Sequence, residues 1–214
     1  MKSRFLMNAP ELLLKQALSF GLDSFPLTIQ LTSSNVEANA LFQQMVADNP
    51  ELVFEQTSSR EILVMLPTGG KSGWRSLWIG TELSLWTRQY GGVAFDSSTL
   101  FQLPGGAKRS PDCAWVAADR WGLLTEEEQE SYPPLSPDFV IELRSKSDRL
   151  TALKEKMLDY ALNGVRLGWL IDPFEKQVHI YRVDGSIEIL NPPLSIEGED
   201  VLPGFVLNLA SIWN

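Results

Sequence analysis

The segment that decides the fold reads Ser136-Pro-Asp-Phe-Val-Ile-Glu-Leu-Arg-Ser-Lys-Ser-Asp148, and Arg149-Leu-Thr-Ala-Leu-Lys-Glu-Lys-Met-Leu-Asp-Tyr160 follows it directly. Apolar and other side chains alternate in the first part, which is typical of a strand. The apolar face of this strand holds Phe139, Ile141 and Leu143. Asp138, Glu142 and Arg144 share the opposite face by the same period of two. We therefore expect a strand that carries acid, followed by a helix that carries base.

This polar row has two interpretations. It forms either the solvated face of an edge strand or a set of functional groups at the end of a sheet. The charge just after Glu142 is positive, because residues 144–156 hold five Lys or Arg and only two acids, and a solvated helical face is the alternative explanation for this cluster. The acids Glu126, Glu127, Glu128 and Glu130 gather just before the strand, where a solvated helical face explains them.

Composition limits the class of protein. The 214 residues are 44% hydrophobic and 10% aromatic, which is enough for a large core. No apolar run approaches the roughly 20 residues that span a bilayer, so we expect a soluble, cytoplasmic protein. One cysteine cannot form an internal disulfide, and one histidine excludes a His-rich metal site. Any metal must therefore be held by oxygen ligands.

The net charge of −9 weighs against non-specific binding of nucleic acid, because phosphate neutralisation normally needs a basic surface.

Two regions are predicted. Residues 1–50 are expected to form an N-terminal helical extension, with one helix at residues 11–20 and a second at residues 34–47 that a capping box at Ser34 and Glu37 opens. The apolar stripe of the second helix is predicted to comprise Val36, Ala40, Leu41 and Met45. We assign this region to packing or dimerisation, and residues 51–214 to the main domain.

Residues 51–214 alternate between strand and helix patterns, which predicts a mixed α/β (α+β) fold. The expected strands cover residues 52–55, 61–66, 93–95, 99–103, 112–116, 139–143, 166–172, 177–183 and 186–190. Helices are expected at residues 76–90 and 149–160, and residues 119–132 form a polar loop or short helix. The strand, helix and strand of residues 139–172 predict a parallel crossover. The tail to residue 213 is expected to be a loop and a packing segment.

Three residues outside residues 136–160 are considered for a functional or a structural role. Asp112 opens a strand directly after Pro111, whose fixed φ suits the first positions of a strand. Glu82 borders the apolar face of the helix at residues 76–90, although an exposed surface glutamate explains it about as well. His179 lies in a hairpin and is expected to be structural. Asp112 and Glu142, with cationic side chains just beyond, form a set suited to a hard divalent cation and a phosphate.

These residues resemble a known family. The segments Arg109-Ser-Pro-Asp112, Pro137-Asp-Phe-Val-Ile-Glu142 and Asn163-Gly-Val-Arg-Leu-Gly-Trp-Leu-Ile-Asp-Pro173 look like the Uma-type family of restriction-endonuclease-like proteins. The resemblance covers roughly residues 52–209. It implies the PD-(D/E)-x-K nuclease fold, a restriction endonuclease-like mixed β-sheet flanked by helices that binds Mg²⁺, or Mn²⁺ in its place, at one edge of the sheet.

Carried over to this chain, the resemblance makes Asp112 and Glu142 the metal ligands and Glu82 the candidate helix carboxylate. The lysine of (D/E)-x-K is replaced by Arg144, which cannot lose a proton and so cannot act as a general base. Lys156 matches the lysine of the family's helix, and Lys154 is the alternative. Arg144 and Lys154 are candidates for holding a phosphate.

The resemblance implies a metal-dependent endonuclease that hydrolyses phosphodiester bonds of nucleic acid, with DNA expected before RNA. We also expect a homodimer. The alternative is a catalytically inactive binding or regulatory module on the nuclease fold, which Arg144 and the acidic net charge favour. A third interpretation is a structural dimer built from the N-terminal helices and the C-terminal hairpin.

Overall fold

The computed structural model describes residues 4–7, 27–31, 35–50, 52–65 and 68–214. The chain divides into two compact units, of which the first comprises residues 1–67 and 105–109 and the second residues 68–104 and 110–214. The division predicted at residue 50 does not coincide with this one. The helix predicted at residues 11–20 and the capping residue Ser34 lie outside the described residues.

The first unit contains strands within residues 1–50, where a helical extension was expected. Its elements are β1 (Arg4–Met7), β2 (Leu27–Leu31), α2 (Asn35–Asp48), β3 (Val53–Gln56), β4 (Glu61–Met65) and β7 (Lys108–Arg109). The strands follow the order β1-β2-β4-β3-β7. β1 and β2 are parallel, and β4 is antiparallel to both β2 and β3. The predicted hairpin of β3 and β4 is confirmed, whereas the strands β1 and β2 were not expected in the N-terminal extension.

The helix predicted at residues 34–47 is confirmed as α2, but its apolar stripe differs from the prediction. Ala38, Phe42 and Met45 are buried, whereas Ala40 is exposed. Spacings of four and three residues put these three side chains on one face, and the large Phe42 ring fixes which face turns inward. The ammonium of Lys108 lies 4.8 Å from the centre of that ring.

The second unit is built around a six-stranded sheet. Its elements are α3 (Gly70–Tyr90), β5 (Val93–Asp96), β6 (Phe101–Gln102), β8 (Cys113–Val116), α4 (Ala118–Trp121), α5 (Glu126–Glu130), β9 (Phe139–Leu143), α6 (Leu150–Leu162), β10 (Leu167–Asp172), β11 (Gln177–Arg182), β12 (Ile187–Leu190), β13 (Ser195–Glu197) and β14 (Val206–Asn208). The sheet order is β12-β11-β10-β9-β8-β5. β9 and β10 are parallel and all other neighbours are antiparallel. The predicted mixed sheet and its parallel crossover through α6 are confirmed.

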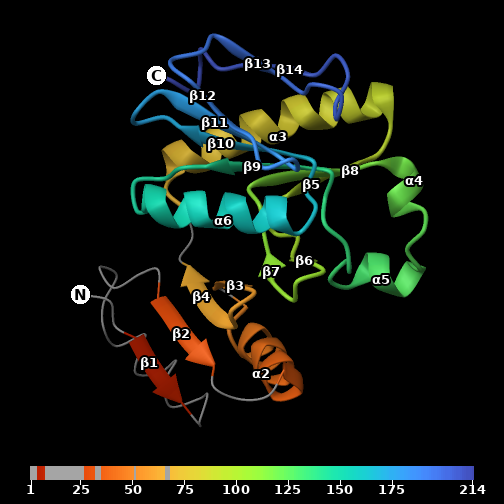
Figure 1. Ribbon diagram of the computed structural model, residues 1–214, viewed down its shortest axis with the longest axis vertical. Coiled ribbons are helices and arrows are strands. Elements are labelled where there is room, and N and C mark those ends of the chain that lie inside the picture. Colours follow the sequence, from red (N-terminus) through yellow and green to blue (C-terminus); the bar gives the residue numbers. More distant parts are fainter. Residues whose placement is uncertain (1–3, 8–26, 32–34, 51, 66–67) are drawn as a thin grey trace. The chain divides into compact units, whose positions relative to one another are not determined.

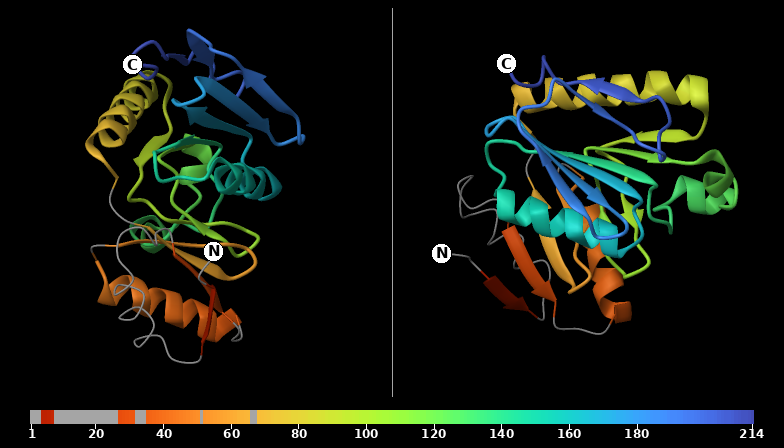
Figure 2. Two further views of the ribbon diagram at one scale, coloured as in Figure 1. Left: turned by 90° about the vertical axis from the view of Figure 1, so that its left-hand side faces the viewer. Right: turned by 45° about the horizontal axis from the view of Figure 1, so that its top comes forward.

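Two long helices cover the two faces of this sheet, with α3 on one side and α6 on the other (Figure 1). Figure 2 shows the same arrangement from two further directions, with the β13–β14 hairpin on the α3 side. No helix of the described residues has the length and hydropathy that crossing a membrane requires.

The strand at the centre of the deciding segment, β9, is buried along its whole length. It lies between β8 and β10, so the interpretation as an edge strand with a solvated face is wrong. Phe139, Ile141 and Leu143 belong to the core on the α3 side, as the alternation predicts. The other residues of β9, Val140 and Glu142, must point toward α6 because successive side chains alternate.

The C-terminal tail completes the core on the α3 side. Residues 195–197 and 206–208 pair as the hairpin β13–β14, where a loop was predicted. Phe205 stacks on Trp169 with ring centres 5.8 Å apart, and Trp169 meets Phe139 edge to face at 4.7 Å. The hairpin escaped prediction because its strands have only three residues each, too few for a period to be recognised.

The turn from α3 into β5 gives a test of the packing between helix and sheet. Gly91 and Gly92 both have positive φ, at +88° and +84°. A Cβ on Gly92 would lie 2.6 Å from the carbonyl oxygen of Val116 and against the Trp115 indole, whereas one on Gly91 would meet nothing within 4 Å. Gly91→Ala should therefore cost only the backbone strain, about 1–3 kcal/mol, and Gly92→Ala about 1–3 kcal/mol more for overpacking.

Urea unfolding of the two variants measures this difference, with Gly91→Ala as the matched control for strain. Equal free energies of unfolding would contradict the close contact between this turn and β8.

Candidate active site

The two carboxylates predicted as metal ligands lie on neighbouring strands. The antiparallel register pairs Cys113 of β8 with Ile141 of β9, so one step further along Asp112 lies opposite Glu142. Residues in opposite positions of an antiparallel pair share a face of the sheet. The Oδ2 atom of Asp112 accepts a hydrogen bond of 2.7 Å from the Leu143 amide, which ties the start of β8 to the end of β9.

A lysine and a tyrosine of α6 meet on Glu142. The Lys156 Nζ lies 2.7 Å from Glu142 Oε1, and the Tyr160 hydroxyl donates to the same oxygen at 3.0 Å. Both side chains and Glu142 are buried. Lys156 Nζ also donates to the carbonyl oxygen of Ser110 at 3.2 Å, two residues before Asp112. A carboxylate held by two donors and an ammonium held by two acceptors form a rigid group at one end of the sheet.

The structure decides between Lys156 and Lys154, the two lysines that the sequence left as alternatives. Lys156 contacts Glu142, whereas Lys154 is only half-buried and its charge acts on His179 of β11. A shift of two residues turns a side chain by about 200° around a helix, so Lys154 and Lys156 cannot both reach Glu142. The lysine placed at Glu142 is Lys156.

Tyr160 was not among the predicted site residues. Its position four residues after Lys156 was the available signal, because residues at this spacing lie on the same face of a helix. The Lys156 Nζ is 5.8 Å from the centre of the Tyr160 ring.

The other polar residues of the deciding segment have partners of their own. Arg144 Nη1 lies 2.7 Å from the Oδ2 of Asp172, a fully buried carboxylate at the end of β10. Asp172 Oδ1 accepts from the Phe174 amide at 2.9 Å. Asp138, at the opposite end of β9, lies 3.0 Å from Arg120. Asp138, Glu142 and Arg144 therefore belong to three separate contacts, and the role of Arg144 in holding a phosphate stays a prediction.

Glu82 is not brought to the two carboxylates. It belongs to α3, which covers the face of the sheet opposite to Lys156 and Tyr160. The Cys113 sulfur lies 4.0 Å from the Ser76 carbonyl of α3, and a Cβ on Gly80 would lie 3.5 Å from the same sulfur, so this part of the helix packs on β8. Within the described part of the chain, no three acidic, histidine or cysteine side chains gather closely enough to hold an ion.

The carboxylates of the site affect the pKa of the single cysteine, Cys113. Burial raises the pKa of Cys113, and the carboxylates of Asp112, Asp96 and Glu142 raise it further. The Cys113 thiol is therefore neutral and unreactive at physiological pH.

The donor set suits magnesium. Mg²⁺ prefers oxygen ligands and is usually held by one or two carboxylates together with substrate phosphates and water. Asp112 and Glu142 supply two carboxylates on one face of the sheet, so a third protein ligand is not required. Asp112 and Glu142 therefore fit a magnesium ion.

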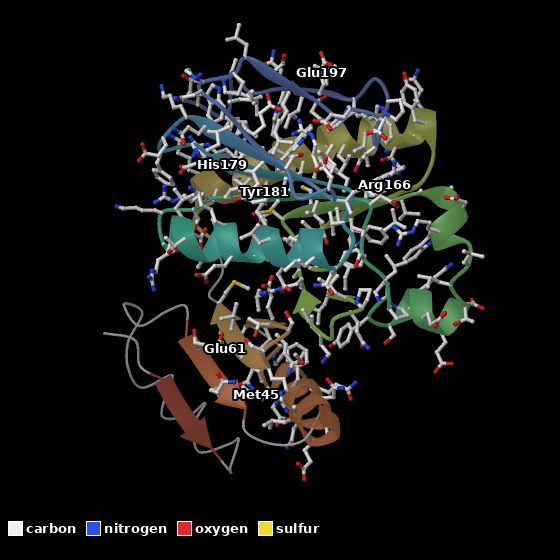
Figure 3. The ribbon with its side chains drawn as sticks, in the orientation of Figure 1. Met45, Glu61, Arg166, His179, Tyr181 and Glu197 are labelled. Atoms are coloured by element: carbon white, nitrogen blue, oxygen red, sulfur yellow. The ribbon has the colours of Figure 1, made fainter. Side chains whose placement is uncertain are left out.

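His179 lies on β11, where Figure 3 labels it beside Tyr181. The register places His179 opposite Leu170, and Leu170 lies beside Glu142, so all three occupy one row across the sheet. His179 Nε2 is buried and has no hydrogen-bond partner among the described residues. Burial lowers the pKa of His179, the Lys154 ammonium lowers it further, and Asp172 opposes both effects. A neutral imidazole that packs under α6 agrees with the expected structural role.

Residues 40–210 match the sequence model of a family described as "Uma2: Putative restriction endonuclease". A crystal structure of a putative nuclease belonging to DUF820 from Anabaena variabilis superposes with a TM-score of 0.63 at 20% identity, over 75% of this chain and 89% of that chain. At this identity the likeness shows the fold. No curated protein matches the chain.

The pair of Lys156 and Glu142 should behave as a buried, coupled unit. Lys156→Met leaves the Glu142 charge buried without its ammonium, which we expect to cost about 3–5 kcal/mol of unfolding free energy. The double variant Lys156→Met with Glu142→Gln should lose less than the sum of the two single variants, because the unpaired charge is gone. Urea unfolding of the four proteins gives the coupling energy.

Lys154→Met is the matched control on the same helix, and we expect it to change stability by about 0.5 kcal/mol or less. Additive costs for Lys156 and Glu142 would show that the two side chains do not interact in solution.

His179 should make stability depend on pH. Its pKa is lower in the folded chain than the ordinary value of 6.5, so the unfolded chain binds the extra proton as pH falls. The contribution of His179 to the free energy of unfolding is fully present above pH 6.5. It is lost as the pH falls from there through the lowered pKa of the folded state. Chemical unfolding between pH 7.5 and 5 should show that the free energy of unfolding falls as the pH falls. In His179→Leu this dependence on pH should be weaker. The single imidazole signal in proton NMR reports the native pKa, and a value above 6.5 would refute this prediction.

Proposed function

Because the chain belongs to the Uma2 family of putative restriction endonucleases, we propose that it is a metal-dependent endonuclease that hydrolyses phosphodiester bonds of DNA. The observation that carries the proposal is the contact of Lys156 with Glu142, 2.7 Å long, beside Asp112. It supplies a lysine next to the acidic pair although the usual sequence position holds Arg144.

Asp112 and Glu142 would hold magnesium, or manganese in its place. When bound, the cation would polarise the phosphoryl group and make the attacking water more acidic. The two carboxylates are on adjacent strands and the Leu143 amide fixes Asp112, so this chain would present its oxygens with little rearrangement.

Lys156 supplies positive charge at the reacting phosphate. Its ammonium is held by Glu142 and the Ser110 carbonyl, so it is already oriented before substrate arrives. A fixed charge of this kind stabilises the negative charge that develops on phosphate oxygens during hydrolysis. Tyr160 acts through Glu142 by donating to the same carboxylate oxygen, which makes it a positioning residue.

A second candidate function is a binding or regulatory module that keeps the fold without turnover. The Arg144 guanidinium favours it, because it stands in the position of the motif's lysine and contacts Asp172. Such a module would bind magnesium or manganese through Asp112 without cleaving DNA, which calorimetry and a cleavage assay together reveal. Homodimerisation is part of both proposals, and light scattering measures it.

The nuclease proposal predicts cleavage of plasmid DNA that needs Mg²⁺ or Mn²⁺ and stops when the metal is chelated. Glu142→Gln should lower the rate at least about 100-fold, and Lys156→Met should lower it by about 100–1000-fold, the usual cost of losing one charge-stabilising group. Rates are measured by gel electrophoresis with protein purified in the same way for every variant.

Arg88→Ala, which removes an exposed cation in the last turn of α3, is the control and should keep the rate of the unchanged chain. Cleavage that persists in both site variants would come from a contaminant and would overturn the proposal.

A further inference from the structure

A basic cavity opens between the start of α3 and the loop that follows β9. It has a volume of about 500 Å³ and is lined by two segments far apart in the sequence. The lining residues are Gly69, Gly70, Lys71 and Ser72 at the start of α3, and Ser145, Lys146 and Ser147 in the loop between β9 and α6. All of them belong to the second unit. They offer two ammonium groups and three hydroxyls and no carboxylate, in a chain with a net charge of −9.

The cavity lies at the end of the sheet that carries the candidate active site. Ser145 follows Glu142 by three residues, which span at most about 10 Å. The other wall is the start of α3, and the Ser76 carbonyl of that helix contacts Cys113, the neighbour of Asp112. Both walls are therefore anchored to the strands that hold Asp112 and Glu142.

Hydrogen bonds hold the shape of the loop. The Ser145 amide donates to Asp148 Oδ2 at 2.7 Å, and the hydroxyls of Ser145 and Ser147 are 3.0 Å apart. Asp148 is the only carboxylate of this loop, and it turns one oxygen to the loop backbone. Lys71 and Lys146 are both exposed, so their ammonium groups can reach a ligand without leaving a buried position.

We propose that this cavity binds a backbone phosphate of the nucleic-acid strand whose neighbouring phosphodiester lies at Asp112 and Glu142. The inference rests on the proposed function and names the part of the chain that grips the substrate backbone. Two lysines and hydroxyl donors match the charge and the acceptor-rich surface of a phosphodiester. Because the lining residue Ser145 is at most about 10 Å along the backbone from Glu142, a phosphate in the cavity lies only a few nucleotides from the bond to be cut, since successive nucleotides rise about 3.4 Å along a strand. This contact would hold the strand in register with the carboxylates.

The test measures DNA binding apart from cleavage. Fluorescence anisotropy of a labelled duplex is recorded with the full chain in EDTA over a series of salt concentrations. Lys71→Ala with Lys146→Ala removes both cations from this one phosphate, so the slope of log K against log salt should become shallower by about 0.9. Affinity at low salt should fall at least about tenfold. Lys71→Ala also removes a cation from the first turn of α3, where positive charge is unfavourable, so the variant should stay folded.

Arg88→Ala at the other end of α3 removes one exposed positive charge far from the cavity lining and should leave the slope unchanged. Inorganic phosphate, added in place of an equal ionic strength of chloride, should compete with DNA in the unchanged chain and less in the double variant if the cavity takes single phosphate groups. An unchanged slope in the double variant, an equal effect of Arg88→Ala, or no binding of DNA by the unchanged chain would each overturn the inference. The nuclease proposal is judged separately, by the metal-dependent cleavage assay on Glu142 and Lys156.

Discussion

The contact between Lys156 and Glu142 is the interaction on which the candidate site depends. A carboxylate buried in a sheet is costly unless a cation and hydrogen-bond donors compensate for the lost water. Glu142 obtains both from a single helix, because Lys156 and Tyr160 are one turn apart on the face of α6 that meets the sheet. The requirement to neutralise Glu142 therefore also selects the rotation of α6 about its axis.

The alternation of β9 divides the second unit into two faces with different tasks. Phe139, Ile141 and Leu143 face α3 and the C-terminal hairpin, where aromatic rings fill the core. Glu142 faces α6 and lies near the end of the strand. Because the apolar face supplies the packing, the other face can accommodate a buried ion pair. This division explains how one five-residue strand contributes both to stability and to the site.

Three acidic residues on β9 and beside it each pair with a different cation. Asp138 pairs with Arg120, Glu142 with Lys156, and Asp172 with Arg144. Separate partners keep the carboxylates from repelling one another in a region that water hardly reaches. For Arg144 the consequence is a structural contact with the end of β10, while the helix provides the lysine at Glu142.

The sequence by itself determined the mixed sheet, the order of its main strands and helices, and the family, because period, turn residues and motif spacing are local properties of the chain. It also pointed to Asp112 and Glu142 as a pair. Only the tertiary structure decided between Lys154 and Lys156, added Tyr160 and left Glu82 apart. Those outcomes depend on how α3 and α6 are rotated and placed against the sheet. That placement is set by packing and by the neutralisation of Glu142, which no local pattern records.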